Sequence, residues 1–274
     1  MSRRERAREV HDGSDSGAVG RRATPAPIPG VLDEDELLDI QSRFGVDEDQ
    51  VRRDHVISHA LAALSGIDDT HLVFFGGTAL SRTHLPGLRL SEDIDLIALV
   101  PRRDAAEEIQ RALGTGLRRA FRTPEFIPDI VHTRHSQPSV MRVGELNVQV
   151  QLLASEGYPA WPTEILDLEQ RYSDAPPARM RVLTAPAFAA SKLASWVDRA
   201  APRDLYDLWA LARRGFIDDE AKRLFARFGP FTSSARVSFA ALPDAMQWST
   251  ALDHQCIPEV DAEEAAEVVR AAWR

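Results

Sequence analysis

Apolar residues recur at helical spacing in the first part of the chain and again in its last third. Near the N-terminus this pattern predicts two helices, the first ending at Gly45 and the second at Gly66. Further along, Thr184 and Pro202 are placed to begin two consecutive helices, because threonine caps helix N-termini and proline suits the first helical turn. A final amphipathic helix is expected over 259–273.

Short apolar runs between these helices predict strands. Residues 72–75 (Leu-Val-Phe-Phe) are followed by Gly76 and Gly77, which is typical of a buried strand that enters a tight turn. Thr78 is placed to cap a short helix after this turn. The next elements are expected in this order: a strand over 93–100, a helix over 104–122, and strands around 126–132 and 140–154.

The order of these elements predicts an α+β fold with a mixed sheet, flanking helices and a mainly helical C-terminal region. Residues 1–30 are rich in charge, serine, glycine and proline, so we expect a disordered tail there. The core that carries the sheet is expected over 31–160. Residues 161–274 are expected to form the helical region that completes the site.

Composition narrows the class of protein. Hydrophobic residues make up 44% of the 274 residues, which is typical of a globular chain. No apolar run approaches the ~20 residues that span a bilayer, and the arginine-rich N-terminus lacks the apolar segment of a secretory signal. The one cysteine, Cys256, excludes an internal disulfide and fits a reducing compartment, so we expect a cytoplasmic protein without a membrane partner.

Lysine is rare in this chain. Lysine and arginine total 33, yet only Lys192 and Lys222 are lysines, and the net charge is −9. Lys192 lies among small apolar residues in the helix that follows Thr184. A solvated surface lysine is the plain interpretation, but a lysine held in apolar surroundings is also how phosphoryl-transfer sites present a point charge to a triphosphate.

Asp93 and Asp95 open the second predicted strand and lie two residues apart, so their side chains point to the same face. Adjacent carboxylates repel each other unless a cation neutralises them, and Mg²⁺ is the oxygen-seeking ion that bridges carboxylates to nucleotide phosphates. The turn at Gly76 and Gly77 allows backbone N–H groups to approach a phosphate. An Asp-x-Asp pair alone is often a solvated face, whereas its combination with this turn indicates a metal and nucleotide site.

Residues 76–80 (Gly-Gly-Thr-Ala-Leu) and 89–96 (Arg-Leu-Ser-Glu-Asp-Ile-Asp-Leu) resemble the signature of the nucleotidyltransferase superfamily, which includes DNA polymerase β. More narrowly, they resemble the AbiEii/MenT family of toxins. Residues 51–57 and the block over 191–208, which holds a lysine, an arginine and Arg-Asp-x-x-Asp-Leu, are similar to other parts of that family's pattern.

The resemblance implies a nucleotidyltransferase-like fold and roles for individual residues. Asp93, Lys192 and Asp207 are expected to be catalytic, with Asp93 and Asp95 holding Mg²⁺. Asp207 would orient Lys192 or the acceptor hydroxyl, or act as a base; a surface ion pair with Arg203, four residues earlier, is the plain alternative for it. The residues expected to cradle the nucleotide are Gly76, Gly77, Thr78, Arg89 and Ser91.

The resemblance also implies a toxin of a toxin–antitoxin system. Such a protein would transfer nucleotides from a nucleoside triphosphate to the 3′ end of tRNA and so stop translation, and a cognate antitoxin would oppose it with or without stable contact. Two alternatives stay open: a nucleotidyltransferase acting on a small molecule or a protein hydroxyl, and a non-catalytic binding module. Many superfamily members carry a third carboxylate on a later strand, but this chain has Asn147, Gln149 and Gln151 there, which leaves one metal or two undecided.

Two histidine pairs have the spacing of metal ligands, His55 with His59 and His132 with His135. Neither pair has a cysteine or a third histidine nearby in sequence, so we do not expect zinc there. Two sets of arginines are interpreted as solvated or as contacts for RNA phosphates. They are Arg111, Arg118, Arg119 and Arg122 on one predicted helix, and Arg3, Arg4, Arg6 and Arg8 in the tail.

Overall fold

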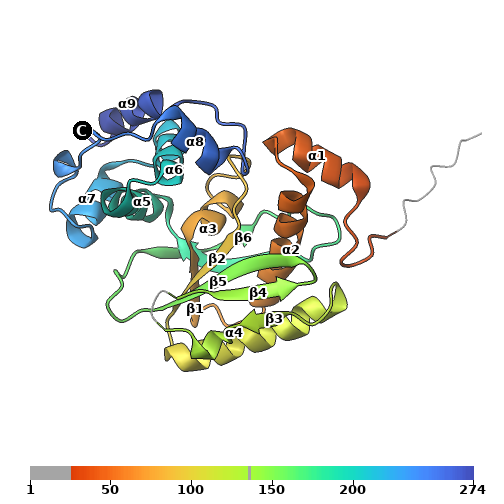
Figure 1. The fold of residues 1–274 in the computed structure, drawn as a ribbon. Coiled ribbons are helices and arrows are strands. Elements are labelled where there is room, and N and C mark those ends of the chain that lie inside the picture. Colours follow the sequence, from red (N-terminus) through yellow and green to blue (C-terminus); the bar gives the residue numbers. More distant parts are fainter. Residues whose placement is uncertain (1–25, 135–136) are drawn as a thin grey trace, which may run out of the picture.

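The computed structural model describes residues 26–134 and 137–274 (Figure 1). Within these ranges the chain forms nine α-helices and a seven-stranded mixed sheet, which confirms the predicted α+β class. None of the helices in these ranges has both the length and the apolar character that a bilayer span requires. Most of the predicted tail, with its arginines, and His135 lie outside the described residues.

The two N-terminal helices form where the sequence predicts them. Helix α1 (Glu34–Phe44) begins after Asp33, whose side chain accepts hydrogen bonds from two backbone N–H groups of the first turn. It ends at Gly45, whose positive φ of 69° suits glycine. Helix α2 (Glu48–Leu64) is largely buried and packs against α4 and the sheet.

The sheet has the strand order β3-β4-β5-β2-β1-β7-β6. Strand β2 lies at its centre, antiparallel to β1 and parallel to β5, while β7 runs parallel to β1 on the other side. The strand bounds are β1 Leu72–Phe75, β2 Asp93–Ala98, β3 Glu125–Ile127, β4 Ser139–Val143, β5 Leu146–Ala154, β6 Thr163–Leu168 and β7 Ala178–Leu183.

Three strand predictions need correction. The single strand expected over 140–154 is two antiparallel strands, β4 and β5, because Gly144 adopts a positive φ of 61° and reverses the chain. The strand expected around 126–132 is shorter and is followed by a 3₁₀ turn. Residues 163–168 and 178–183, expected to lie in the helical region, form β6 and β7 of the same sheet. The first five residues of β7 alternate between buried and more exposed positions, which is a strand pattern.

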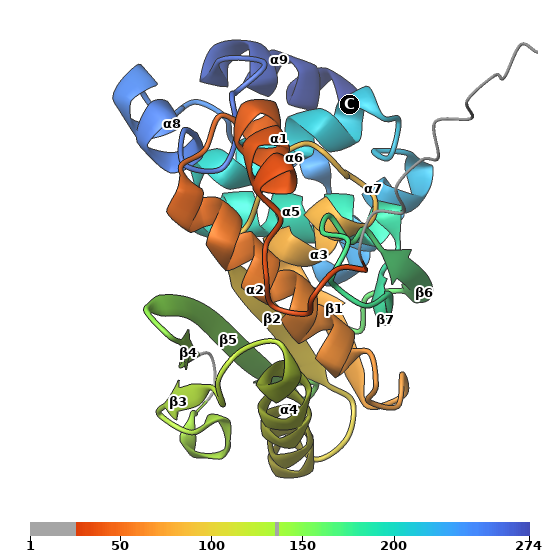
Figure 2. The same cartoon turned by 90° about the vertical axis from the view of Figure 1, so that its right-hand side faces the viewer.

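The remaining helices gather on two sides of the molecule. Helix α4 lies on one side, and helices α5 to α9 lie together on the opposite side (Figures 1 and 2). Because α4 ends at Gly116, Arg111 is the one member of the predicted arginine set that it carries, while Arg118, Arg119 and Arg122 follow in a 3₁₀ turn and a bend. As predicted, Thr184 caps α5, and Pro202 begins α6. The helix bounds are α3 Gly76–Arg82, α4 Arg102–Gly116, α5 Ala185–Arg199, α6 Pro202–Arg213, α7 Asp219–Phe228, α8 Ala245–Leu252 and α9 Ala262–Ala272.

A buried ion network joins α2 and α3 to the loop between β6 and β7. The Asp54 carboxylate lies 2.8 Å from Arg82 Nη2 and 3.0 Å from Arg171 Nη1, and it accepts a hydrogen bond from the Tyr172 hydroxyl. Burial alone would raise the pKa of Asp54, but the two guanidinium groups outweigh this effect and hold the pKa below its usual value. The network therefore fixes α3, which begins at the glycine turn.

We predict that Asp54→Asn lowers the free energy of unfolding by about 3–5 kcal/mol, since it removes the ion-pair partner of the buried Arg82 guanidinium and leaves Arg171 with Glu169 alone. Because the folded-state pKa of Asp54 is depressed, its contribution is present above the ordinary value of 3.8 and is lost as the pH falls through the folded-state value. Urea denaturation at neutral pH measures the change. Asp167→Asn, at an exposed aspartate of β6, is the matched control, and an equal effect of the two substitutions would contradict the prediction.

Candidate active site

Asp93 and Asp95 lie side by side at the start of β2, on the face that lines a pocket. Ile94 and Leu96 alternate with them and are completely buried on the other face, as the sequence predicts. The pocket holds about 290 Å³ and opens between β2, β5, the glycine turn and helix α5. The strand and the helical half of the chain therefore meet at the carboxylate pair.

The two carboxylates lack sufficient positive charge around them. Burial raises the pKa of Asp95 to about 6, with a further rise from the neighbouring Asp93 carboxylate. Burial also raises the pKa of Asp93, and Glu92 adds to the effect. A divalent cation between the pair would remove this repulsion, so the donor set fits a hard metal ion.

The glycine turn is shaped by its neighbours in the site. Gly76 has a positive φ of 78°, and a side chain there would overlap the Asp95 carboxylate. A side chain at Gly77 would come within 2.7 Å of Arg89 Nη2. Gly76 is therefore restricted to glycine by both conformation and space and Gly77 by space, which lets the backbone of the turn lie against the pocket.

Four of the five residues expected to cradle the nucleotide line this pocket: Gly76, Gly77, Arg89 and Ser91. Thr78 lies behind the pocket wall, where its hydroxyl donates a hydrogen bond to the backbone carbonyl of Asp93. Helix α3 begins at Gly76, so Thr78 lies within the helix and the prediction that it caps the helix was wrong. Its hydrogen bond ties α3 to the first residue of β2.

Lys192 projects from α5 to the edge of the pocket and is 7% exposed. Its Nζ lies 3.1 Å from Asp204 Oδ1 and 2.7 Å from Asp207 Oδ2. Asp207 also accepts two hydrogen bonds from the Arg89 guanidinium, at 2.7 and 2.8 Å. One buried carboxylate thus holds both Lys192 and Arg89.

The protonation of Asp207 follows from these contacts. Burial would raise its pKa, but Arg89 and Lys192 outweigh burial and hold the pKa at about 2. Both carboxylate oxygens are occupied by cations, and the side chain lies behind the pocket wall at 1% exposure. Asp207 is therefore a permanent anion that positions two cations and a poor acceptor for a proton.

Two arginines of the site were not assigned to it from the sequence. Arg199 and Arg203 line the pocket beside Lys192. Arg199 is held by Asp204 through contacts of 2.7 and 3.0 Å, whereas Asp207, expected as a possible partner of Arg203, pairs with Arg89 and Lys192 instead. The block from Ser191 onward carried both arginines, but it did not indicate which would face the pocket.

The opposite wall of the pocket comes from β5 and the loop after it. The parallel register places Gln149 beside Asp93 and Gln151 beside Asp95, and both glutamines line the pocket. These positions lie where the sequence predicts the missing third carboxylate. Tyr158, which the sequence did not indicate, completes the wall next to Phe75, with ring centroids 5.6 Å apart.

Comparisons with known proteins identify the family of this chain and support its fold. A family model described as the nucleotidyl transferase AbiEii toxin of type IV toxin–antitoxin systems matches residues 59–273. No curated protein matches the chain. Among solved structures, the chain is similar to MenT4, a nucleotidyltransferase toxin from Mycobacterium tuberculosis H37Rv, with a TM-score of 0.62 and 24% identity over 87% of this chain and 88% of that one.

A weaker likeness is to JHP933 from Helicobacter pylori, with a TM-score of 0.49 and 16% identity over 83% of this chain and 91% of that one. The likeness to MenT4 shows the fold, and the family match spans both carboxylates, the lysine and the α6 aspartates. The chain belongs to the AbiEii family of nucleotidyltransferases, the toxins of type IV toxin–antitoxin systems.

Proposed function

We propose that this toxin is a Mg²⁺-dependent enzyme that transfers nucleotides from a nucleoside triphosphate to the 3′ hydroxyl of tRNA and thereby blocks translation in the cytoplasm. A cognate antitoxin opposes it. The main support for this transfer chemistry is that Asp93, Asp95 and Lys192 line the same pocket. The choice of tRNA rests on the sequence resemblance to the AbiEii/MenT pattern.

Asp93 and Asp95 are the residues that would hold Mg²⁺. Bound there, the ion neutralises the carboxylate pair and the phosphates of the nucleotide. Gln149 and Gln151 stand at the positions of a third carboxylate and carry no charge. We therefore assign one ion to the protein's own carboxylates and give Lys192 part of the charge neutralisation that a second ion would supply.

In the transfer step the acceptor hydroxyl oxygen bonds to the α-phosphorus, and the bond from that phosphorus to the oxygen bridging to the β-phosphate breaks. Pyrophosphate leaves with the negative charge, and the hydroxyl proton passes to solvent water. Lys192, Arg199 and Arg203 line the same pocket and stabilise the charge on the leaving group. Asp207 acts by holding Lys192 in place.

The first test is to incubate the purified protein with total tRNA, Mg²⁺ and each α-³²P-labelled nucleoside triphosphate in turn. We expect label on tRNA with at least one nucleotide, and a loss of about 10²–10³-fold in Asp93→Asn, which removes one metal ligand. Asp198→Asn, at an exposed aspartate of α5, is the control. Label on a small molecule or a protein would identify another acceptor, and no label with any acceptor would favour a binding module.

A second prediction separates positioning from base catalysis at Asp207. Asp207→Asn keeps the size of the side chain but removes the closer of the two carboxylates that hold Lys192 and leaves it with Asp204 alone, so we expect kcat to fall by about 10–100-fold. Because the pKa of Asp207 is about 2, the variant should keep the wild-type shape of its rate profile between about pH 5 and pH 9. A profile that loses its acid limb in the variant would instead make Asp207 the base.

A third prediction tests the metal site through stability. The folded-state pKa of Asp95 is raised to about 6 from 3.8, so stability of the metal-free fold falls as the pH rises from about 4 to about 6, and the full penalty of the charged carboxylate is present above that range. Asp95→Asn should therefore raise Tm in a chelating buffer near pH 8, by ~2–4 °C for each kcal/mol of strain removed. This advantage should shrink as the pH falls towards 4.

The same experiment carries its own control. Added Mg²⁺ should raise the Tm of the wild-type protein and leave the Tm of Asp95→Asn almost unchanged, because the variant has lost a charged ligand. Thermal denaturation followed by fluorescence measures both. A variant that is less stable than the wild type without metal would show that the Asp95 carboxylate is satisfied by the protein alone.

A further inference from the structure

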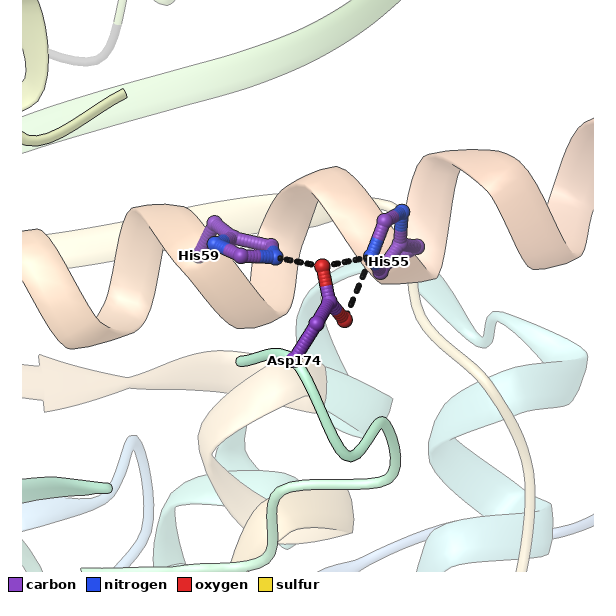
Figure 3. A group of neighbouring side chains, drawn as sticks. All are labelled: His55, His59 and Asp174. Carbon is purple, nitrogen blue, oxygen red and sulfur yellow. Dashed lines mark hydrogen bonds and ion pairs between the residues drawn. The ribbon is translucent and has the colours of Figure 1, made fainter. Parts of the chain in front are cut away.

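A second group of metal-ligating side chains lies outside the active-site pocket. His55 and His59 are four residues apart on α2 and project from the same face of the helix. Asp174 faces them from the loop between β6 and β7. Figure 3 shows both imidazole rings directed at its carboxylate, with Asp174 lying between the two histidines.

The donor atoms of this cluster converge. His55 Nε2 lies 2.9 and 3.1 Å from the two Asp174 carboxylate oxygens, and His59 Nε2 lies 2.9 Å from Oδ2. The three ligand atoms, one from each residue, lie within 4.8 Å of one another. Donors that sit ~2.0–2.1 Å from a tetrahedral zinc ion are about 3.3 Å apart. To bind the ion, each imidazole nitrogen would move a few tenths of an ångström away from the carboxylate, and the two imidazole nitrogens would approach each other by at most about 1.5 Å.

The cluster is enclosed, and the carboxylate is already oriented by a backbone group. All three side chains are at most 5% exposed, and the Phe121 ring lies edge-on to both imidazoles. The backbone N–H of Gly30 donates to Asp174 Oδ2 at 2.7 Å. Hydrogen bonds of this kind to a ligating carboxylate are typical of the outer layer of a metal site.

We propose that His55, His59 and Asp174 form a binding site for one transition-metal ion of the zinc class, distinct from the catalytic carboxylates. Two imidazole nitrogens and one carboxylate oxygen favour zinc over Mg²⁺, which takes oxygen ligands. The sequence argued against zinc because no third ligand lies near the histidines, but the fold brings Asp174 to His59 across 115 residues.

The role of this ion is structural. It would join α2 to the β6–β7 loop, next to the buried network of Asp54 and Arg171 that supports α3. Through Gly30 the same carboxylate also holds the segment that precedes α1. The site does not depend on the proposed transfer reaction, and its test needs no assay of activity.

Zinc retention by the full-length protein tests the proposal. The protein is stripped with a chelator, incubated with Zn²⁺ in excess Mg²⁺ to occupy the catalytic carboxylates, and desalted. We expect elemental analysis to find one zinc per chain and thermal denaturation to show a higher Tm than for the stripped protein. Wild-type protein that retains no zinc under these conditions overturns the proposal.

Two substitutions locate the ion. His59→Gln keeps an N–H donor for Asp174 but removes the ligand, so it should lose the zinc and the rise in Tm. His132→Gln removes an exposed histidine of the other close pair and should change neither. Zinc that stays with His59→Gln, or that is lost from His132→Gln, contradicts the assignment.

A measurement on the wild-type protein decides the matter if His59→Gln does not fold. X-ray absorption at the zinc edge should show two imidazole ligands and one or two oxygen ligands around the bound ion. A shell made only of oxygen atoms would place zinc on the catalytic carboxylates and overturn the proposal.

Discussion

The active site depends on one buried carboxylate, Asp207, which binds cations from two distant parts of the chain. Arg89 precedes β2 and Lys192 belongs to α5, yet both contact Asp207 at 2.7 Å. A buried charge without a partner is costly, so α5 and α6 take a position beside the segment that precedes β2 in which these contacts can form. The contacts that hold the helical half of the chain against the sheet-bearing half therefore also set the position of the Lys192 amine at the pocket of Asp93 and Asp95.

Carboxylates within this small region have opposite properties. Asp207 is neutralised by the protein and has a pKa of about 2, whereas Asp95 is buried beside another acid and has a pKa of about 6. The charge of Asp207 is neutralised without a bound ion, and this residue holds other side chains of the site in place. The Asp95 carboxylate is stabilised in its charged form only when a cation binds beside it, which is the property expected of a metal ligand. The direction of the shift distinguishes the two roles more clearly than burial does.

Local pattern predicted the parts of the site that are encoded by neighbours in sequence. The alternation around Asp93 and Asp95 and the helix start at Thr184 were visible because strand and cap signals act over a few residues. The contact of Asp207 with Lys192 was expected from the family resemblance. The contact of Arg89 with Asp207 and the approach of Asp174 to the α2 histidines were not predictable, since each joins residues more than a hundred positions apart. β6 and β7 were missed because their short alternating runs stand among helical segments.

The order in which the chain supplies its site has a consequence for synthesis. The carboxylates of β2 leave the ribosome first, while Lys192 and the aspartates that hold it lie about a hundred residues further on. β1 gains its second neighbour, β7, only after residue 178 has appeared. A nascent chain therefore carries Asp93 and Asp95, the proposed metal ligands, before it contains Lys192. A cell making this toxin is not exposed to a finished site until most of the chain has been translated.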